Sequence, residues 1–391
     1  MKQEVFIVGA RRSPIGKYGG GLSGVSATDL GAEVIKDLVR KNSMEDLRVD
    51  EVVMGNVLGA GLGQNPARIV VSKAGMSKKI PAYTVNKVCG SGLKSVVLAS
   101  QSIKLGEKNM VIAGGMENMS QSPYLLDNHR FGKKFGDDKL RDSMVCDGIW
   151  CALIDQHMGI TGENVARKFH VARETQDKFA YESHKKALLA QKNKRFEEEI
   201  VGINVGTKGG DVLVGEDEQP RIDTTIEVLG KLKPAFRKDG SVTAGNASSI
   251  NDGAAAVLLV SEKISNKLKP MARVVASAEI GMDPRYMGLG SYYAAKKCLA
   301  KANILVGEVD LWEINEAFAS QSVVVIDKLG VEKKIVNVNG GAIALGHPIG
   351  ASGARILVTL IHEMKRRNDR YGVASLCIGG GQGIAMLVER T

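Results

Sequence analysis

The sequence predicts an α/β fold in which two halves of alternating strands and helices are separated by a long insertion. Short apolar runs that fit buried strands alternate with longer helical segments in both halves. Such alternation predicts layered sheets covered by helices. Residues 120 to about 244 are polar and irregular by comparison, which predicts an inserted segment that covers the sheet. The halves share a similar order of elements, which favours an internal repeat without proving a duplication.

The first half opens on an apolar run of six residues, Val5–Ala10, followed directly by two arginines. This run is too short for a signal peptide or a membrane span, so it predicts a buried strand. Ala27–Lys41 places apolar residues at helical spacing and predicts an amphipathic helix. The other elements expected in this half are strands at Val52–Val57, Met110–Ala113 and Ala254–Val260, and a largely apolar helix at Leu93–Leu105.

The insertion contains one strong helical pattern, at Arg173–Asn193. The second half then repeats the alternation of the first. Its expected elements are strands at Arg273–Ala278, Leu311–Ile314, Ile335–Val338, Gly372–Cys377 and Ile384–Glu389, and helices at Tyr293–Ala302, from the Asn315 turn to Leu329, and at Ala351–Lys365.

The charge and the cysteines limit the classes of protein to which the chain can belong. A formal net charge of +10 favours anionic partners, and both a phosphate-bearing small substrate and a merely basic surface fit it. Basic residues form no long block and aromatic residues make up only 5% of the chain, which argues against nucleic acid. The five cysteines are scattered and form no CxxC pair, so we expect neither a disulfide framework nor a metal site. This usage predicts a reducing, cytoplasmic location.

Cys89 stands in the segment Asn86-Lys-Val-Cys-Gly-Ser-Gly92, directly before the expected apolar helix. Backbone N–H groups at a helix N-terminus favour an anion, so this position predicts a lowered thiol pKa and a nucleophile. An inert buried cysteine fits the segment equally well. His347 lies between Gly346 and Pro348 before another helix, where it could accept a proton from the nucleophile. A loop histidine at the surface is the alternative.

Two further segments carry polar groups at the ends of expected strands. Cys377 ends a buried strand and opens the glycine run Gly379-Gly-Gly-Gln-Gly383, which suits a proton shuttle. The run is a poor dinucleotide loop, because no helix and no acidic residue follow it at the required distance. Asn315 follows a strand and precedes a helix. Taken alone it is best explained as a helix N-cap, and the alternative is a group that holds a water molecule.

Together with Gly114–Met119, Val242–Ser248, Asn251–Ala255 and Asn337–Ala342, these segments resemble the thiolase family along essentially the whole chain. They are most similar to its biosynthetic branch, the acetyl-CoA acetyltransferases or acetoacetyl-CoA thiolases. The resemblance implies the thiolase fold, in which two similar α/β halves form a five-layered α-β-α-β-α structure with an inserted loop domain. It implies these parts: an N-terminal half at 1–119, the loop domain at 120–246, a return to the first half at 247–268, and a C-terminal half at 269–391.

The resemblance also implies a Claisen condensation of two acetyl-CoA molecules to acetoacetyl-CoA and CoA, with thiolysis as its reverse. Cys89 takes the first acetyl group while His347 accepts its proton, and Cys377 removes the α-proton of the second acetyl-CoA. His347 and a water held by Asn315 form one oxyanion hole, and the N–H groups of Cys89 and Gly379 form the other. The implied substrate-binding residues are His157, Met158, Arg221, Phe236, Ala244, Ser248, Met287, Ala317 and Phe318. The implied enzyme uses CoA thioesters without a cofactor and forms a homotetramer, with no nucleic-acid or membrane partner.

Three rivals to this interpretation differ in substrate or in class. The triplet His157-Met-Gly favours short chains, whereas Ser291-Tyr-Tyr-Ala and Ser249 depart from the biosynthetic pattern of Pro-x-Pro-Ala and glycine. A degradative 3-ketoacyl-CoA thiolase of broader chain length therefore stays open. A ketoacyl-synthase-like enzyme would carry a second histidine in place of Asn315. A non-catalytic acyl-CoA-binding relative would have lost a reactive residue, and all three are present.

Overall fold

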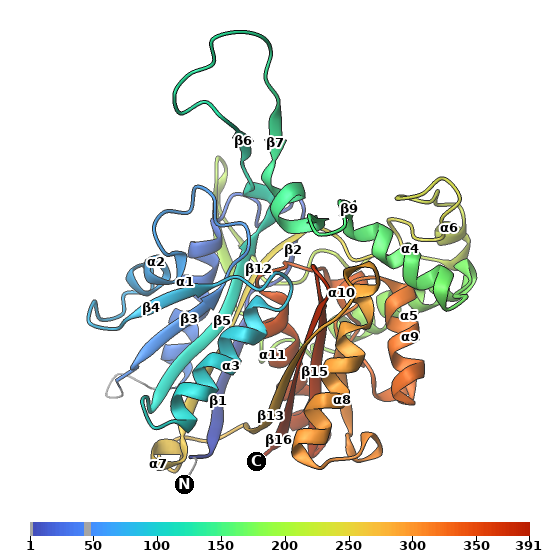
Figure 1. The fold of residues 1–391 in the computed structure, drawn as a ribbon. Coiled ribbons are helices and arrows are strands. Elements are labelled where there is room, and N and C mark those ends of the chain that lie inside the picture. The colour runs from blue at the N-terminus through green and yellow to red at the C-terminus, as the bar shows by residue number, and fades with distance from the viewer. Residues whose placement is uncertain (1–2, 43–47) are drawn as a thin grey trace.

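The computed structural model describes residues 3–42 and 48–391, and these residues form five layers (Figure 1). In the described chain a ten-stranded sheet runs in the order β14-β15-β16-β13-β1-β12-β5-β3-β4, with β2 paired to β12. Its two halves join where β1 meets β13 through only two residue pairs, Phe6 with Arg273 and Ile7 with Ala272. The strands are β1 (Val5–Arg12), β2 (Gly16–Lys17), β3 (Glu51–Gly55), β4 (Ala82–Val85), β5 (Met110–Asn118), β12 (Asn251–Ser261), β13 (Ala272–Gly281), β14 (Leu311–Ile314), β15 (Tyr371–Ile378) and β16 (Gln382–Arg390).

Helices fill the middle layer and both outer layers. Helices α3 (Ser91–Lys104) and α11 (Ser352–Arg367) share one apolar core with strands of both halves. The outer face of the first half packs on α1 (Ala27–Lys41) and α2 (Pro66–Lys73). The outer face of the second half packs on α8 (Gly290–Ala302) and α9 (Ala319–Leu329). The predicted α/β fold of two similar halves is therefore confirmed.

The two central helices approach each other backbone to backbone near their N-termini. A Cβ placed on Gly353 would lie 2.4 Å from the Leu93 nitrogen, and one on Gly92 would lie 2.8 Å from the Ala354 nitrogen. Only glycine leaves room for this contact. The close approach brings the residues that precede α3 and α11 to one place, and Cys89 and His347 are among them.

The insertion leaves the sheet after β5 and returns at β12, so that Asn118 lies beside Asp252 in register. A hairpin of β6 (Tyr124–Leu126) and β7 (Leu140–Asp142) projects far from the body of the molecule (Figure 1). The rest of the insertion packs against the two halves. Its other elements are η2 (Met119–Gln121), η3 (Met144–Ile149), β8 (Trp150–Cys151), β9 (Gln156–His157), α4 (Met158–Lys168), α5 (Arg173–Lys192), β10 (Ile203–Thr207), β11 (Gly210–Val214) and α6 (Ile226–Gly230).

The prediction of a strand at Ile335–Val338 is wrong. Lys333–Ile335 forms a 3-10 turn, and only Val336 bridges to Trp312 of β14. Beyond it Asn337 has φ +44°, outside strand geometry, and its side-chain amide bonds both backbone groups of Ile314 at 2.8 Å. The Asn337 side chain therefore makes the hydrogen bonds to Ile314 that the expected strand would have made. The shorter elements that remain are α7 (Glu262–Ser265), η4 (Pro284–Leu289), η5 (Val306–Glu308), η6 (Lys333–Ile335) and α10 (Ala342–Leu345).

In the described part of the chain, no helix combines the length and the apolar character needed to cross a membrane.

Candidate active site

Cys89 lies on a strained turn just before α3. Val88 has φ +48°, a conformation that β-branched residues rarely adopt. The turn is held by Ser91, whose hydroxyl donates to the Val88 carbonyl at 2.6 Å and accepts from the Lys87 N–H at 2.8 Å. Strain of this kind persists only where the surrounding structure fixes it, and it gathers at functional sites. No feature of the sequence predicted this strained turn.

The predicted lowering of the Cys89 pKa is wrong. Burial raises the pKa of this thiol above its usual value, and the Glu117 carboxylate adds to the rise. The N–H groups of Gly379 and of Cys89 itself approach the sulfur and lower the pKa by less than burial raises it. At neutral pH Cys89 is therefore a thiol, and it needs a base beside it to become a nucleophile.

Cys377 is 1% exposed and lies behind the pocket surface, in an apolar cluster with Met287, Ala317 and Phe318. Burial and the neighbouring Cys89 raise the pKa of its thiol. The structure therefore brings Cys377 close to Cys89. Gly379 follows at the end of β15, where its N–H points at the Cys89 sulfur.

His347 is buried and hydrogen-bonded in a way that fixes its tautomer. The Ser352 hydroxyl lies 2.5 Å from His347 Nδ1 and 2.9 Å from the Pro348 carbonyl oxygen. A carbonyl can only accept, so the serine proton goes to Pro348 and His347 Nδ1 must donate to the serine oxygen. This leaves Nε2 as the unprotonated nitrogen. Burial, with Arg355 nearby, lowers the pKa of His347 to about 3, so the ring is a neutral base at neutral pH.

Asn315 does not cap a helix, because α9 begins at Ala319 with Phe318 in the capping position. The N-cap interpretation is therefore wrong. Its Nδ2 instead lies 3.3 Å from His347 Nε2. Its Oδ1 is buried and has no hydrogen-bond partner among the described residues. Such an atom is normally satisfied by a water molecule, which fits the water-holding alternative.

A pocket of about 520 Å³ opens over Cys89 and His347. The His157 ring stacks on Phe236 with 4.9 Å between ring centroids, and Phe236 meets Phe318 edge to face at 6.4 Å. Burial lowers the pKa of His157. All nine predicted substrate-binding residues lie in the lining: His157, Met158, Arg221, Phe236, Ala244, Ser248, Met287, Ala317 and Phe318. Sequence reasoning missed Lys17, Tyr18 and Gln219 in the same wall.

The two departures from the biosynthetic pattern occupy different places. Ser291 begins the buried side of α8 and lies outside the pocket lining. Ser249 lines the pocket, and its hydroxyl donates to Asn251 Oδ1 at 2.7 Å. The same oxygen accepts the His347 N–H at 2.9 Å. Of the two departures, Ser249 is thus the one linked to His347, through Asn251.

Glu117 ties the loops of the two halves together beneath the site. One carboxylate oxygen accepts from Asn56 Nδ2 at 2.7 Å and from the Leu58 N–H at 3.1 Å. The other accepts from the Val57 N–H at 3.0 Å and from the Gly350 N–H, in the loop that carries His347, at 2.9 Å. Burial raises the pKa of Glu117 to about 7. Glu117 and Asn251 lie within the segments Gly114–Met119 and Asn251–Ala255, but nothing in the sequence assigned these contacts or the contact of Ser352 with His347.

Comparisons with known proteins agree along the full length. A protein named acetyl-CoA acetyltransferase from Allochromatium vinosum is 52% identical, and the match covers 100% of both chains. Another of that name from Pseudomonas aeruginosa is also 52% identical, over 99% of this chain and 100% of its own. The crystal structure of human mitochondrial 3-ketoacyl-CoA thiolase superposes with a TM-score of 0.97 at 43% identity, over 100% of this chain and 99% of the other.

Family models agree with these relatives. The models for "Thiolase, N-terminal domain" and "Thiolase, C-terminal domain" match residues 5–263 and 268–390. The acetyl-CoA acetyltransferase structure from Bacillus anthracis superposes with a TM-score of 0.98 at 42% identity, over 100% of this chain and 99% of the other. The chain therefore belongs to the thiolase family.

Proposed function

We propose that the protein is an acetyl-CoA C-acetyltransferase that condenses two acetyl-CoA molecules to acetoacetyl-CoA and CoA, and catalyses the reverse thiolysis. The observation that carries this proposal is the meeting of the Cys89 thiol with a neutral His347 in one pocket. Acetyl-CoA, acetoacetyl-CoA and CoA are its substrates and products, and the chemistry needs no cofactor. Relatives at about 50% identity over their full length bear the name of this activity.

Acyl transfer begins with a proton transfer between neutral groups. His347 Nε2 takes the Cys89 proton, and the thiolate attacks the thioester carbonyl of the first acetyl-CoA. The oxyanion that forms accepts hydrogen bonds from the N–H groups of Cys89 and Gly379, which approach the Cys89 sulfur. CoA leaves as a thiolate, while Cys89 holds the acetyl group and His347 holds the proton.

Condensation then uses Cys377. Its thiol protonates the departing CoA and becomes a strongly basic thiolate, because burial disfavours its charged form. This thiolate takes the α-proton of the second acetyl-CoA. The enolate oxygen is stabilised by protonated His347 and by a water bound at Asn315. The carbanion attacks acetyl-Cys89, and the released Cys89 thiolate recovers its proton from His347, so every proton is accounted for.

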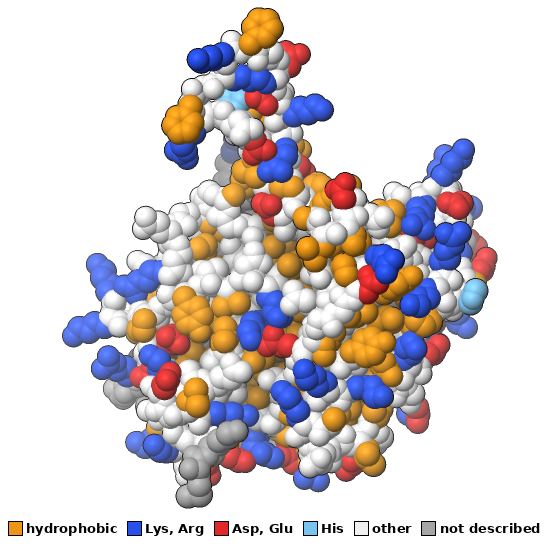
Figure 2. Space-filling model, in the orientation of Figure 1, with side chains coloured by type: hydrophobic (Ala, Val, Ile, Leu, Met, Phe, Trp, Pro, Cys, Tyr) orange, Lys and Arg blue, Asp and Glu red, His pale blue; other side chains and the backbone are white. Residues whose placement is uncertain are grey.

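The assembly and location proposed here are a homotetramer and the cytoplasm. Figure 2 shows large apolar side chains at the tip of the projecting hairpin, and the side chains of Phe131 and Phe135 there are both 96% exposed. Exposed aromatic side chains on a projecting element are typical of protein–protein contacts. The five cysteines are all free, which supports a reducing compartment.

Trapping of the acyl-enzyme tests the mechanism. Incubation with acetyl-CoA is expected to add one acetyl group to the intact protein, located at Cys89 by peptide mass spectrometry. Cys89→Ala should abolish the adduct and turnover, whereas Cys146→Ala, a matched change of a partly exposed cysteine, should leave both intact. Cys377→Ala should still form the adduct but fail at condensation. Retained turnover in Cys89→Ala would contradict the nucleophile.

A thiolysis assay decides the chain length. The second candidate is a degradative 3-ketoacyl-CoA thiolase, favoured by the close structural match to the human mitochondrial enzyme of that name. Rates with free CoA should be compared for acetoacetyl-CoA and for 3-ketoacyl chains of about six to ten carbons. A steep preference for acetoacetyl-CoA supports the proposal, and equal or faster cleavage of the longer chains supports the alternative.

A further inference from the structure

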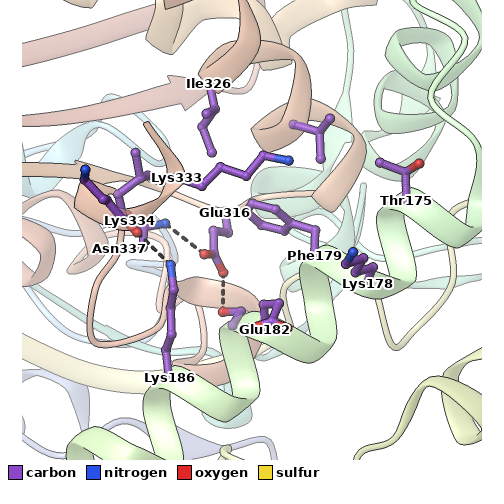
Figure 3. A pocket seen from close by; sticks show the side chains of 13 residues that line it. Thr175, Lys178, Phe179, Glu182, Lys186, Glu316, Ile326, Lys333, Lys334 and Asn337 are labelled. Carbon is purple, nitrogen blue, oxygen red and sulfur yellow. Dashed lines mark hydrogen bonds between the residues drawn. The ribbon is translucent and has the colours of Figure 1, made fainter. Parts of the chain in front are cut away.

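A second pocket lies between α5, α9 and the residues that follow α9, with Glu316 in its lining (Figure 3). Its volume is about 540 Å³, within the range of small-molecule sites. It shares no lining residue with the pocket over Cys89. The chemistry proposed above does not use it.

Lysines and apolar side chains line this pocket together. Lys334 is paired with Glu332, and Lys186 donates to the Val336 carbonyl at 2.9 Å. Among the described residues, Lys178 and Lys333 form no ion pair. Figure 3 shows Lys333 extending across the cavity, with Lys178 on the α5 side. The apolar part of the lining consists of Phe179, Val323, Ile326 and Val336.

The buried carboxylate on the floor of the pocket already has hydrogen-bond partners within the protein. Glu316 accepts from Asn337 Nδ2 at 2.8 Å, from the Ser183 hydroxyl at 2.7 Å and from the Ile343 N–H at 3.2 Å. Because its oxygens are engaged, this buried carboxylate is a poor ligand for a cation. Together with Glu182 in the wall it disfavours a doubly charged anion more than a singly charged one.

We propose that this pocket binds a small monocarboxylate with an apolar tail of several carbons. Lys178 and Lys333 hold the carboxylate at the mouth, and the tail packs on Phe179, Val323 and Ile326. Two unpaired ammonium groups supply the charge that one carboxylate needs. The apolar wall supplies the driving force for the tail, at a gain that rises with each buried methylene. A bound ligand would rest on Glu316 and Asn337, the residues that hold the Asn315 turn.

Calorimetric titration of the whole protein with hexanoate, acetate and inorganic phosphate tests the proposal. Hexanoate is expected to bind at one site, more tightly than acetate, with phosphate weakest. The double variant Lys178→Ala/Lys333→Ala should weaken hexanoate binding roughly tenfold, because two charge-assisted contacts are lost.

Two controls locate the binding. Lys263→Ala/Lys267→Ala removes two exposed lysines elsewhere, and Arg221→Ala alters the pocket over Cys89; neither should change hexanoate binding. The proposal is overturned if hexanoate shows no saturable binding, if phosphate binds as tightly as hexanoate, or if the Lys178/Lys333 variant binds like the unaltered protein. A loss confined to Arg221→Ala would place the ligand in the other pocket and also overturn it.

Discussion

The hydrogen bond from His347 Nδ1 to the Ser352 oxygen decides which ring nitrogen carries the proton, and this gives a testable prediction. Ser352→Ala removes the acceptor that holds the Nδ1 proton, so the ring loses its fixed tautomer. We expect the acylation rate to fall roughly 10- to 100-fold, as for other partners that orient a reactive histidine, with little change in KM. Rapid-quench measurement of acetyl-enzyme formation checks this.

Ser291→Ala is the matched control for that variant. Ser291 is also fully buried, but its hydroxyl makes only a long contact of 3.4 Å with the Gly288 carbonyl. It should acylate at the normal rate. Equal rates in both variants would show that Ser352 does not position His347.

The pH dependence of acylation follows from the charge state of the same histidine. The pKa of His347 is lowered to about 3, so the neutral, proton-accepting form is present at every pH above that value. Acylation should therefore show no acidic limb between about pH 5 and about pH 8, where an unperturbed histidine would titrate. The pre-steady-state rate of acetyl-enzyme formation across this range is the measurement. An acidic limb with a midpoint near 6.5 would show that the ring is not desolvated as described.

The rate of alkylation at different pH values tests the raised pKa of Cys89. The raised pKa of Cys89 predicts that inactivation by iodoacetamide accelerates as pH rises through and beyond 9, where a thiolate first accumulates. Fast inactivation that is already constant at pH 7 would instead indicate a lowered pKa. Protection by acetyl-CoA places the modified residue in the pocket, and peptide mass spectrometry identifies it as Cys89.

At the scale of elements, Asn337 supports the strand end from which Asn315 extends. It bonds the Ile314 N–H and carbonyl at 2.8 Å each, and also Glu316. Asn337→Gly keeps a residue that tolerates positive φ but removes the amide, so buried backbone groups lose their partners. We expect a loss of about 2–4 kcal/mol in unfolding free energy. We also expect kcat to fall by a larger factor than KM rises, because Ile314, which loses its partner, directly precedes Asn315 in the chain.

Asn303→Gly is the matched control, because it replaces another asparagine of positive φ whose backbone, rather than its amide, closes a helix. Asn303 has φ +54° and is exposed at the end of α8, where its backbone closes the helix. Urea denaturation should show nearly unchanged stability for this variant. If both variants lose the same stability, the amide of Asn337 is not the cause.

Periodicity and apolar runs predicted most elements, because the strands are buried on both faces and the long helices are amphipathic. They failed at Ile335–Val338, where four residues have the composition of a strand. There the Asn337 side chain, and not a paired strand, bonds the end of β14. They also missed α2 (Pro66–Lys73), which is short and set among glycine-rich loops. Motif positions identified Cys89, His347 and Cys377. The direction of the Cys89 pKa shift could not be predicted from the sequence, because it depends on burial by residues far away in the chain.

At the scale of the whole molecule, the sequence predicted two halves and an insertion but not how they meet. The join of β1 to β13 in the middle of the sheet rests on two residue pairs, which no local pattern encodes. The close contact of α3 with α11 depends on Gly92 and Gly353, far apart in the chain. The site therefore exists only when both halves are folded together, although every residue in it belongs to one chain.

The projecting hairpin gives a prediction about assembly. Phe131→Ser/Phe135→Ser removes two aromatic side chains that are 96% exposed, so any interface built on them loses most of its apolar area. We expect light scattering to show a smaller assembly than the unaltered protein. Leu213→Ser/Val212→Ser, on the exposed β10–β11 hairpin, is the matched control and should keep the full mass. Because the pocket is built from one chain, the smaller assembly should retain acetyl-enzyme formation at Cys89. An unchanged mass in the Phe131/Phe135 variant would exclude this hairpin as the contact between protomers.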